Sequence, residues 1–166
     1  MSDPAQDKKR RLALATAIAT AIAIPAEGMR RVAYYDPPQV LTVCWGHTGP
    51  DVVKNRVYSI EECKALMDKD MLKAVTAVER CAPGLPPQVL GAFADAAYNM
   101  GPTVACDTAH SQAARYLRAG DLAAACKELP KWSKARVAGV LVTLPGLAKR
   151  RNAEKDTCLS NLKEAP

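Results

Sequence analysis

Three residues in the N-terminal part of the chain are of the types that acid–base chemistry needs. Glu27 follows an uncharged apolar segment, Asp36 lies in a Tyr-Tyr-Asp-Pro-Pro turn, and Thr42 opens an apolar run. A carboxyl beside an apolar helix end tends to be desolvated, which raises its pKa and suits it to donate a proton. A carboxyl in a turn stays solvated and ionised, and a nearby hydroxyl could orient water. Two carboxyls in such opposed environments are what glycoside hydrolysis uses.

The elements that would position these residues predict an α+β fold. The length of 166 residues fits one domain, and turn signals bracket a β-rich run from Val40 to Trp45, which predicts one small sheet of two or three strands. Ser59 and Glu62 form a capping box that opens a long helix, which Pro83-Gly84 ends. A small N-terminal sheet lobe would then be joined by this long helix to a helical C-terminal lobe. The further helices are expected from Pro86-Pro87 to about Gly101, and then over 103–118, 121–129, 131–139 and 145–162.

Motifs in several parts of the chain agree with one enzyme family. They are Glu27-Gly28, Ala33-Tyr34-Tyr35-Asp36, Leu41-Thr42-Val43-Cys44-Trp45-Gly46-His47-Thr48, Tyr98-Asn99-Met100-Gly101 and the stretch from Leu144-Pro145-Gly146-Leu147 through Arg150-Arg151 to Glu154. Together they resemble the phage-type lysozymes, the muramidase endolysins of glycoside hydrolase family 24. The resemblance covers nearly the whole chain.

This resemblance implies a two-lobed fold with a cleft between the lobes, and a catalytic role for three residues. Glu27 is implied as the general acid, and Asp36 and Thr42 as the holders of the attacking water. The substrate implied is bacterial peptidoglycan, cleaved at the β-1,4 bond from N-acetylmuramic acid to N-acetylglucosamine. Cleavage of this bond by a phage endolysin lyses the host cell.

Further residues are expected to lie around the implied cleft. Tyr98 and Asn99 end a helix and are expected to bind substrate together with Thr48, while a simple helix cap is an equally good interpretation of the first two. His47 is more often structural than catalytic when it stands alone. We expect it to form an ion pair with Asp70 on the long helix, which would fasten the sheet to that helix.

The cysteines predict an oxidising destination. They are even in number and dispersed, which fits disulfides in an exported protein, although the sequence leaves their pairing open. Buried thiols in a cytosolic protein are the alternative. Zinc is a poor interpretation because Cys44 and His47 have no second ligand pair at short spacing, and we expect neither a metal nor a cofactor. The disulfide candidates are Cys44, Cys63, Cys81, Cys106, Cys126 and Cys158.

The N-terminus has features of an export signal. A basic cluster at residues 7–11 precedes residues 12–26, which carry no charge. As a helix this segment would span only about 22 Å, less than the roughly 30 Å of the hydrocarbon core, so it would be a weak membrane anchor. The basic cluster would hold the N-terminus in the cytoplasm and send the remainder across. A cleaved signal peptide and the first helix of the domain are the alternatives.

We therefore divide the chain into an export or anchor segment, residues 1–26, and a lysozyme catalytic domain, residues 27–166. Within the family the N-terminus resembles the signal-arrest-release type. That type implies export by the host secretion machinery, an inactive form tethered to the host inner membrane through residues 12–26, and an active form released into the periplasm. No cysteine lies in this segment, so control by a disulfide swap is not indicated. A cytosolic endolysin that needs a holin pore is the alternative.

Composition limits which other functions the chain could have. The net charge of +6 and the pI near 9.1 favour an anionic partner. Nucleic acid ranks last because the basic residues are dispersed and aromatic residues make up only 5% of the chain. An exported, non-catalytic module that binds the cell wall is one competitor. A lytic transglycosylase is another, although Asp36 and Thr42 at the family spacing argue against it. We expect the basic run 149–151 to be a solvated helix face or a contact with the anionic cell wall. We expect the protein to be a monomer.

Overall fold

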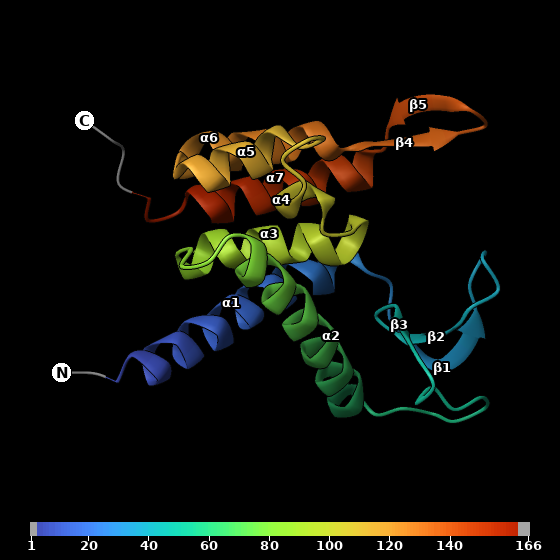
Figure 1. The fold of residues 1–166 in the computed structure, drawn as a ribbon. Helices are drawn as coiled ribbons and strands as arrows, with labels where there is room; N and C mark the ends of the chain where they lie inside the picture. Colours follow the sequence, from blue (N-terminus) through green and yellow to red (C-terminus); the bar gives the residue numbers. More distant parts are fainter. Residues whose placement is uncertain (1–2, 163–166) are drawn as a thin grey trace.

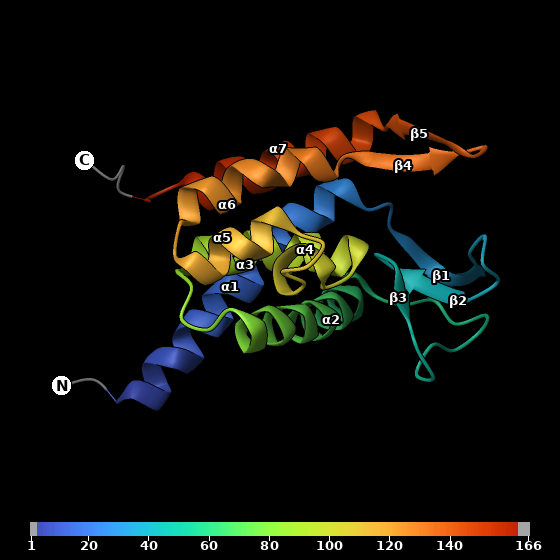
Figure 2. The ribbon, with the colours of Figure 1, turned by 45° about the horizontal axis from the view of Figure 1, so that its top comes forward.

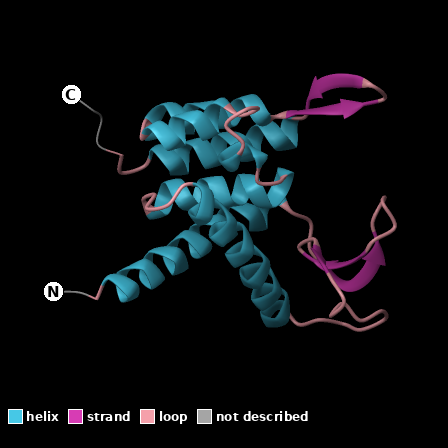
Figure 3. Cartoon of the chain, in the orientation of Figure 1, coloured by secondary structure: helices cyan, strands magenta, loops and turns pink. Residues whose placement is uncertain are grey.

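The computed structural model describes residues 3–162 and arranges them in two lobes (Figure 1). The smaller lobe holds an antiparallel sheet whose strand order is β1-β2-β3. Its strands are β1 (Arg30–Tyr35), β2 (Leu41–Cys44) and β3 (His47–Thr48). Figure 3 shows this sheet set apart from the helices. The predicted α+β class and the small N-terminal sheet are confirmed.

The long helix α2 (Ile60–Cys81) joins the sheet lobe to the helical lobe (Figure 2). The Ser59 hydroxyl accepts a hydrogen bond from the Glu62 N–H at 3.0 Å, and the Glu62 carboxylate accepts one from the Ser59 N–H at 2.7 Å. The predicted capping box is therefore present. A disulfide between Cys44 and Cys63 ties β2 to the first turn of α2.

The helical lobe is built around α3 (Pro87–Met100), in which every residue from Val89 to Ala97 is buried. A helix that is buried all round must be covered on every side, and α1, α2 and α7 pack against it. The other elements are α4 (Thr103–Cys106), α5 (Gln112–Ala119), α6 (Leu122–Glu128), the 3-10 helix η1 (Leu129–Trp132) and α7 (Pro145–Leu159).

Two further disulfides fasten the helical lobe. Cys81 pairs with Cys106, which ties the end of α2 to α4, and Cys126 pairs with Cys158, which ties α6 to α7. All six cysteines are thus paired, so the predicted disulfides are confirmed and their connectivity is Cys44–Cys63, Cys81–Cys106 and Cys126–Cys158.

Helix α1 (Pro4–Ala26) contains the whole uncharged segment and packs against α3. Ala15 and Ala19, on its buried side, are fully covered. At the opposing position on α3, a Cβ added to Gly91 would lie 2.7 Å from Ile18 Cγ2 and 2.9 Å from the Ala15 carbonyl oxygen. The two helices approach closely because both contribute small residues.

The N-terminal half of α1 is held by Arg11. Its guanidinium donates to Glu79 Oε1 at 2.5 Å and to the Leu85 carbonyl at 2.9 Å, and the hydrogen bond from Arg11 lowers the pKa of Glu79. Within residues 3–162, no helix combines the length and the apolar character that crossing a bilayer requires. The structure describes the packed form of this segment, so the division of the chain at residue 26 stays a prediction.

The predicted helix over 131–139 is wrong. The chain instead leaves η1 and forms a hairpin of β4 (Lys134–Val137) and β5 (Val140–Thr143). Valine is β-branched and favours strands. Ala138 and Gly139, with φ of 48° and 82°, supply the two positive φ angles that a tight hairpin turn needs. The chain therefore has strands outside the one small sheet that the sequence predicts.

The predicted helix over 103–118 is also wrong, because it is two helices. Helix α4 ends at Cys106 and α5 begins at Gln112. Between them, Ser111 begins the second helix with its side chain, whose Oγ accepts a hydrogen bond from the Ala114 N–H at 3.1 Å.

Candidate active site

Glu27 lies where α1, α3 and α7 meet. It is the residue that caps the end of α1, and its side chain is 28% exposed. Arg150 on α7 donates from Nη1 to Glu27 Oε1 at 2.5 Å. Through Nε and Nη2 the same guanidinium donates to both oxygens of Asp95 on α3, at 2.9 and 2.7 Å. A bidentate pair of this kind fixes the plane of the guanidinium, which in turn fixes the carboxylate of Glu27.

The environment of Glu27 is therefore not the apolar one that the sequence predicts. Burial alone would lower the pKa of Arg150, but its hydrogen bonds and attraction to Asp95 and Glu27 raise it above its usual value. The charged guanidinium of Arg150 thus donates a hydrogen bond to Oε1 of Glu27. Within the described part of the chain no hydrogen bond reaches Oε2, which leaves this oxygen to meet a ligand.

The basic run at the start of α7 is not a solvated face at two of its three positions. Arg150 is 5% exposed and Arg151 is fully buried. Arg151 pairs with Glu154, which is also fully buried. Burial raises the pKa of Glu154 to about 10 and lowers the pKa of Arg151. The prediction that these arginines face solvent or the cell wall is wrong, because the helix that carries them packs against α3.

A pocket of about 460 Å³ opens beside Glu27 between the two lobes. Thr48 and Gly46 line it from the sheet lobe, and Tyr98 and Asn99 line it from the end of α3. The structure thus brings Glu27 together with all three residues predicted to bind substrate. Asp70 and Lys73 of α2 complete the lining.

Tyr98 connects the lobes at this pocket. Its hydroxyl donates to the carbonyl oxygen of Trp45 at 3.0 Å, across from α3 to the sheet lobe. Burial, together with the negative charge of Glu27, raises the pKa of Tyr98 to about 12. The phenol is therefore a protonated donor at neutral pH, and it does more than end a helix.

Asp36 and Thr42 form a unit of their own at the turn between β1 and β2. Thr42 donates its hydroxyl to Val40 O at 3.0 Å and to Asp36 Oδ2 at 3.3 Å, and the Val40 N–H donates to Asp36 Oδ1 at 2.8 Å. Neither Asp36 nor Thr42 lines the pocket, but Thr42 pairs with Thr48 in the sheet. The catalytic roles of Glu27, Asp36 and Thr42 stay predictions.

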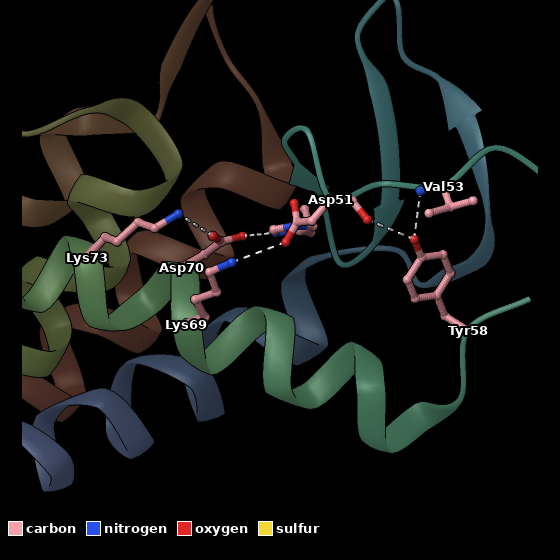
Figure 4. Close-up of polar contacts among 7 residues, drawn as sticks. Asp51, Val53, Tyr58, Lys69, Asp70 and Lys73 are labelled. Carbon is pink, nitrogen blue, oxygen red and sulfur yellow. Dashed lines mark hydrogen bonds and ion pairs between the residues drawn. The ribbon is translucent and has the colours of Figure 1, made fainter. Parts of the chain in front are cut away.

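The predicted contact between His47 and Asp70 is present. His47 Nδ1 lies 2.5 Å from Asp70 Oδ2, and Nε2 lies 3.0 Å from Asp51 Oδ1. Figure 4 shows Lys69 and Lys73 of α2 on the same carboxylates: Lys69 donates to Asp51 and Lys73 to Asp70, each at 3.1 Å. The hydrogen bonds from His47 and Lys69 lower the pKa of Asp51 to about 2. This cluster fastens the sheet lobe to α2 beside the pocket.

Sequence reasoning missed Asp95 as a site residue and misplaced Arg150. One signal was available: Asp95 is a carboxylate inside an otherwise apolar helix segment, Val89 to Ala97, and a buried charge needs a partner. The partner lies 55 positions further along the chain, so no local spacing connects the two residues.

Comparison with known protein families shows which family this chain belongs to. Residues 25–154 match the phage lysozyme family. The chain belongs to that family. Among its relatives, a SAR-endolysin of bacteriophage PS119 is 35% identical over 134 residues, which are 80% of this chain and 76% of that protein.

Solved structures agree with this assignment. The endolysin from Escherichia coli O157:H7 phage FAHEc1 is 25% identical, with a TM-score of 0.73 over 89% of this chain and 94% of that one. The active form of the P1 phage endolysin Lyz is 24% identical, with a TM-score of 0.73 over 90% of this chain and 86% of that one. Family, relatives and fold confirm the prediction of a glycoside hydrolase, a muramidase of the phage endolysin kind.

Proposed function

We propose that this chain hydrolyses the β-1,4 bond between N-acetylmuramic acid and N-acetylglucosamine in peptidoglycan, with Glu27 as the general acid. The observation that carries the proposal is the pocket between the lobes, where Glu27 lies beside Thr48, Tyr98 and Asn99. Arg150 holds one oxygen of the carboxylate and leaves the other for the glycosidic oxygen. A protonated Glu27 would donate its proton to that leaving oxygen.

Asp36 and Thr42 would hold the attacking water. The Asp36 carboxylate already accepts hydrogen bonds from the Val40 N–H and the Thr42 hydroxyl, so it is fixed in orientation before substrate arrives. A carboxylate acts as a general base toward water when it stays ionised beside the anomeric carbon. Pairing between Thr42 and Thr48 connects this unit to the pocket that Glu27 lines.

The test is digestion of purified peptidoglycan by the wild type and by Glu27→Gln, with the released fragments analysed by mass. General acid–base catalysis contributes about 10²–10⁴-fold, so we expect the variant to lose at least about a hundredfold in rate. Equal thermal denaturation of the two proteins is the control for folding. Wild-type turnover by the variant would contradict the role of Glu27. Release of no fragments by the folded wild type would favour the non-catalytic wall-binding module.

We further propose that residues 12–26 first hold the enzyme, inactive, in the host inner membrane after export by the host secretion machinery, and that release into the periplasm activates it. Two features support this proposal: relatives named SAR-endolysins, and an α1 whose buried alanines pack against α3. The same residues cannot lie in lipid and against α3 at once. Because Glu27 directly follows α1, the pocket would form only after α1 leaves the bilayer.

The exposed face of α1 offers a test that leaves its packed face intact. Ala13, Ala17 and Ala21 are exposed in the folded enzyme. Their replacement by leucine makes the segment more hydrophobic, so we expect the triple variant to stay in the membrane fraction and to cause no lysis, while detergent extraction recovers active enzyme. The matched triple serine variant should be released. Release of the leucine variant to the wild-type extent would contradict anchoring by this segment.

A further inference from the structure

The side chains of Asp95 and Glu154 form a pair of carboxyl groups inside the helical lobe, where α7 lies along α3 (Figure 1). Both side chains are fully buried, and the two groups are close enough to share a hydrogen bond. A hydrogen bond between two carboxyl groups needs a proton on one of them, because two carboxylates can only accept. One member of the pair is therefore neutral.

Asp95 is the member of the pair that is ionised. Both of its oxygens accept hydrogen bonds from Arg150, at 2.9 Å from Nε and 2.7 Å from Nη2. A carboxylate accepts such a bidentate contact, whereas a protonated oxygen would point its hydrogen at an N–H donor. The proton of the pair therefore belongs to Glu154.

The partners of Glu154 indicate which of its oxygens holds the proton. Arg151 donates to Oε1 through Nη2. Oε2 is buried, and within residues 3–162 no donor reaches it. A buried carboxylate oxygen without a donor costs free energy, whereas a hydroxyl oxygen donates instead. Because proton positions are assigned from such networks, this one places the proton on Oε2, with Asp95 as its acceptor.

The charges around Glu154 favour the same assignment. Its charged neighbours are Arg150 and Arg151 on α7 and Asp95 on α3, and Arg150 also pairs with Glu27. Among the described residues of α6 and η1, which also pack against α7, none forms an ion pair with it. A neutral Glu154 leaves two carboxylates facing two guanidiniums in this network, and an ionised one leaves three. Burial, followed by the hydrogen bond with Asp95, raises the pKa of Glu154 to about 10.

We propose that Glu154 is held as a neutral carboxylic acid whose hydroxyl donates to Asp95, and that it is thereby a positioning residue for Glu27. This inference rests on the proposed role of Glu27 as general acid. Arg150 Nε lies 2.9 Å from Asp95 Oδ2 and 3.9 Å from Glu154 Oε1. An ionised Glu154 would repel Asp95 and compete with it for this donor. The proton on Glu154 therefore keeps Arg150 on Asp95, in the orientation that reaches Glu27.

The pH dependence of stability tests the protonation state without reference to activity. Glu154→Gln keeps the shape of a neutral carboxyl, and its amide donates to Asp95 and accepts from Arg151. Glu79→Gln is the matched control. Glu79 is also a buried glutamate bound to an arginine, Arg11, but the hydrogen bond from that arginine lowers its pKa.

The two variants should differ in the sign of the effect. A neutral Glu154 keeps its proton in the folded state up to a pH far above the unfolded pKa of about 4.3, so its stabilisation is full at low pH and is lost as pH rises. The unfolding equilibrium constant of the wild type, divided by that of Glu154→Gln, should rise by up to about tenfold per pH unit between about pH 5 and pH 9. A constant ratio across this window would overturn the proposal.

For the control, the ratio of the wild type to Glu79→Gln should stay constant above about pH 5 and rise only as pH falls below about 4, because the folded pKa of Glu79 is lowered. Urea unfolding at several pH values measures both ratios. If Glu154→Gln follows the pattern of Glu79→Gln, Glu154 is an ordinary ionised partner of Arg151 and the proposal is wrong.

Steady-state kinetics test the positioning role. Arg151→Met/Glu154→Leu removes the donor to Asp95 without leaving a buried charge unpaired, and apolar replacement of a buried ion pair often preserves stability. We expect its kcat on soluble peptidoglycan fragments to fall about tenfold with little change in KM. Glu154→Gln, which supplies a donor again, should keep kcat within about twofold of the wild type. Wild-type kcat in the double variant, or a tenfold loss in a folded Glu154→Gln protein, would overturn the positioning role.

Failure of this inference and failure of the proposed function give different results. If Glu27→Gln digests peptidoglycan at the wild-type rate, the general-acid role fails, while the pH dependence of stability would still assign the proton to Glu154. If Glu27→Gln is inactive and Arg151→Met/Glu154→Leu keeps the wild-type kcat, only the positioning role of Glu154 fails.

Discussion

Glu27 is held through Arg150, and Arg150 is held through Asp95. The guanidinium bonds Asp95 with two donors and Glu27 with a third, and both Asp95 and Arg150 are almost fully buried. Asp95 is fully buried and does not line the pocket beside Glu27. It acts as a positioning residue for the carboxylate that would donate the proton.

Replacement of Asp95 by Asn should therefore reduce kcat more than it changes KM. The amide keeps the shape of the side chain but loses the charge that anchors Arg150, and misplaced catalytic groups cost about tenfold to a hundredfold in rate. Steady-state kinetics on soluble peptidoglycan fragments would measure both constants. The Arg150→Lys variant keeps the positive charge but not the forked set of donors. It should also lose more in kcat than it changes in KM, and it should be more stable than the Asp95→Asn variant. A change in KM alone would contradict the positioning role.

The cluster around His47 and Asp51 beside the pocket predicts that the stability of the fold depends on pH. The pKa of Asp51 is lowered to about 2 by hydrogen bonds from His47 and Lys69, whereas an unperturbed Asp titrates near pKa 3.9. A carboxyl with a lowered pKa stabilises the fold above its unfolded pKa, and this contribution is lost as pH falls through the two values.

We therefore expect the unfolding temperature of the wild type to fall between about pH 4 and pH 2 by more than that of Asp51→Asn. Calorimetry at several pH values in this window would measure the difference. Because Asp51 lies on the surface, its contribution is modest and should weaken in high salt. Parallel acid unfolding of the two proteins would contradict the cluster's role.

At the scale of elements, the contact between α1 and α3 decides where Glu27 lies. Gly91 allows the close approach, since an added Cβ would meet Ile18 Cγ2 at 2.7 Å and the Ala15 carbonyl at 2.9 Å. Alanine normally stabilises a helix relative to glycine by about 0.5–1 kcal/mol. At Gly91, the overlap of the added Cβ with α1 should make the substitution by alanine destabilising instead.

Gly91→Ala should lower the free energy of unfolding by about 1–3 kcal/mol, the usual cost of overpacking, and should lower activity because α1 ends at Glu27. Gly146→Ala is the matched control for stability, because nothing lies within 4 Å of a Cβ there. Urea unfolding with a parallel activity assay would measure both effects. A more stable and fully active Gly91→Ala protein would show that the contact is looser than the structure has it.

The same elements show what local sequence could predict. The capping box at Ser59 and the small sheet were predictable because their signals lie within a few residues. The β4–β5 hairpin was not, because Lys131, Ala135 and neighbouring residues fit a short helix equally well and only the Ala138-Gly139 turn distinguishes the two. The link from Glu27 to Arg150 joins residues 123 positions apart, so only the folded chain reveals it.

At the scale of the whole molecule, the two lobes are fastened on both sides of the pocket. The Cys44–Cys63 disulfide and the His47–Asp70 contact tie the sheet to α2, and Tyr98 ties it to α3. A disulfide that closes a loop of some twenty residues typically stabilises a fold by about 3 kcal/mol. The sheet lobe is thus tied to both α2 and α3 next to the pocket, which limits relative movement of the two lobes there.

The most direct test of the central claim is digestion of peptidoglycan in water labelled with heavy oxygen, followed by mass analysis of the new ends. Hydrolysis with Glu27 as the acid should place one heavy oxygen on the reducing N-acetylmuramic acid, and Glu27→Gln should produce no such ends. Anhydro ends without the label would assign the enzyme to the lytic transglycosylases, and labelled N-acetylglucosamine ends would show that it cleaves the other bond of the strand. Either result would contradict hydrolysis of the muramic acid bond with Glu27 as the general acid.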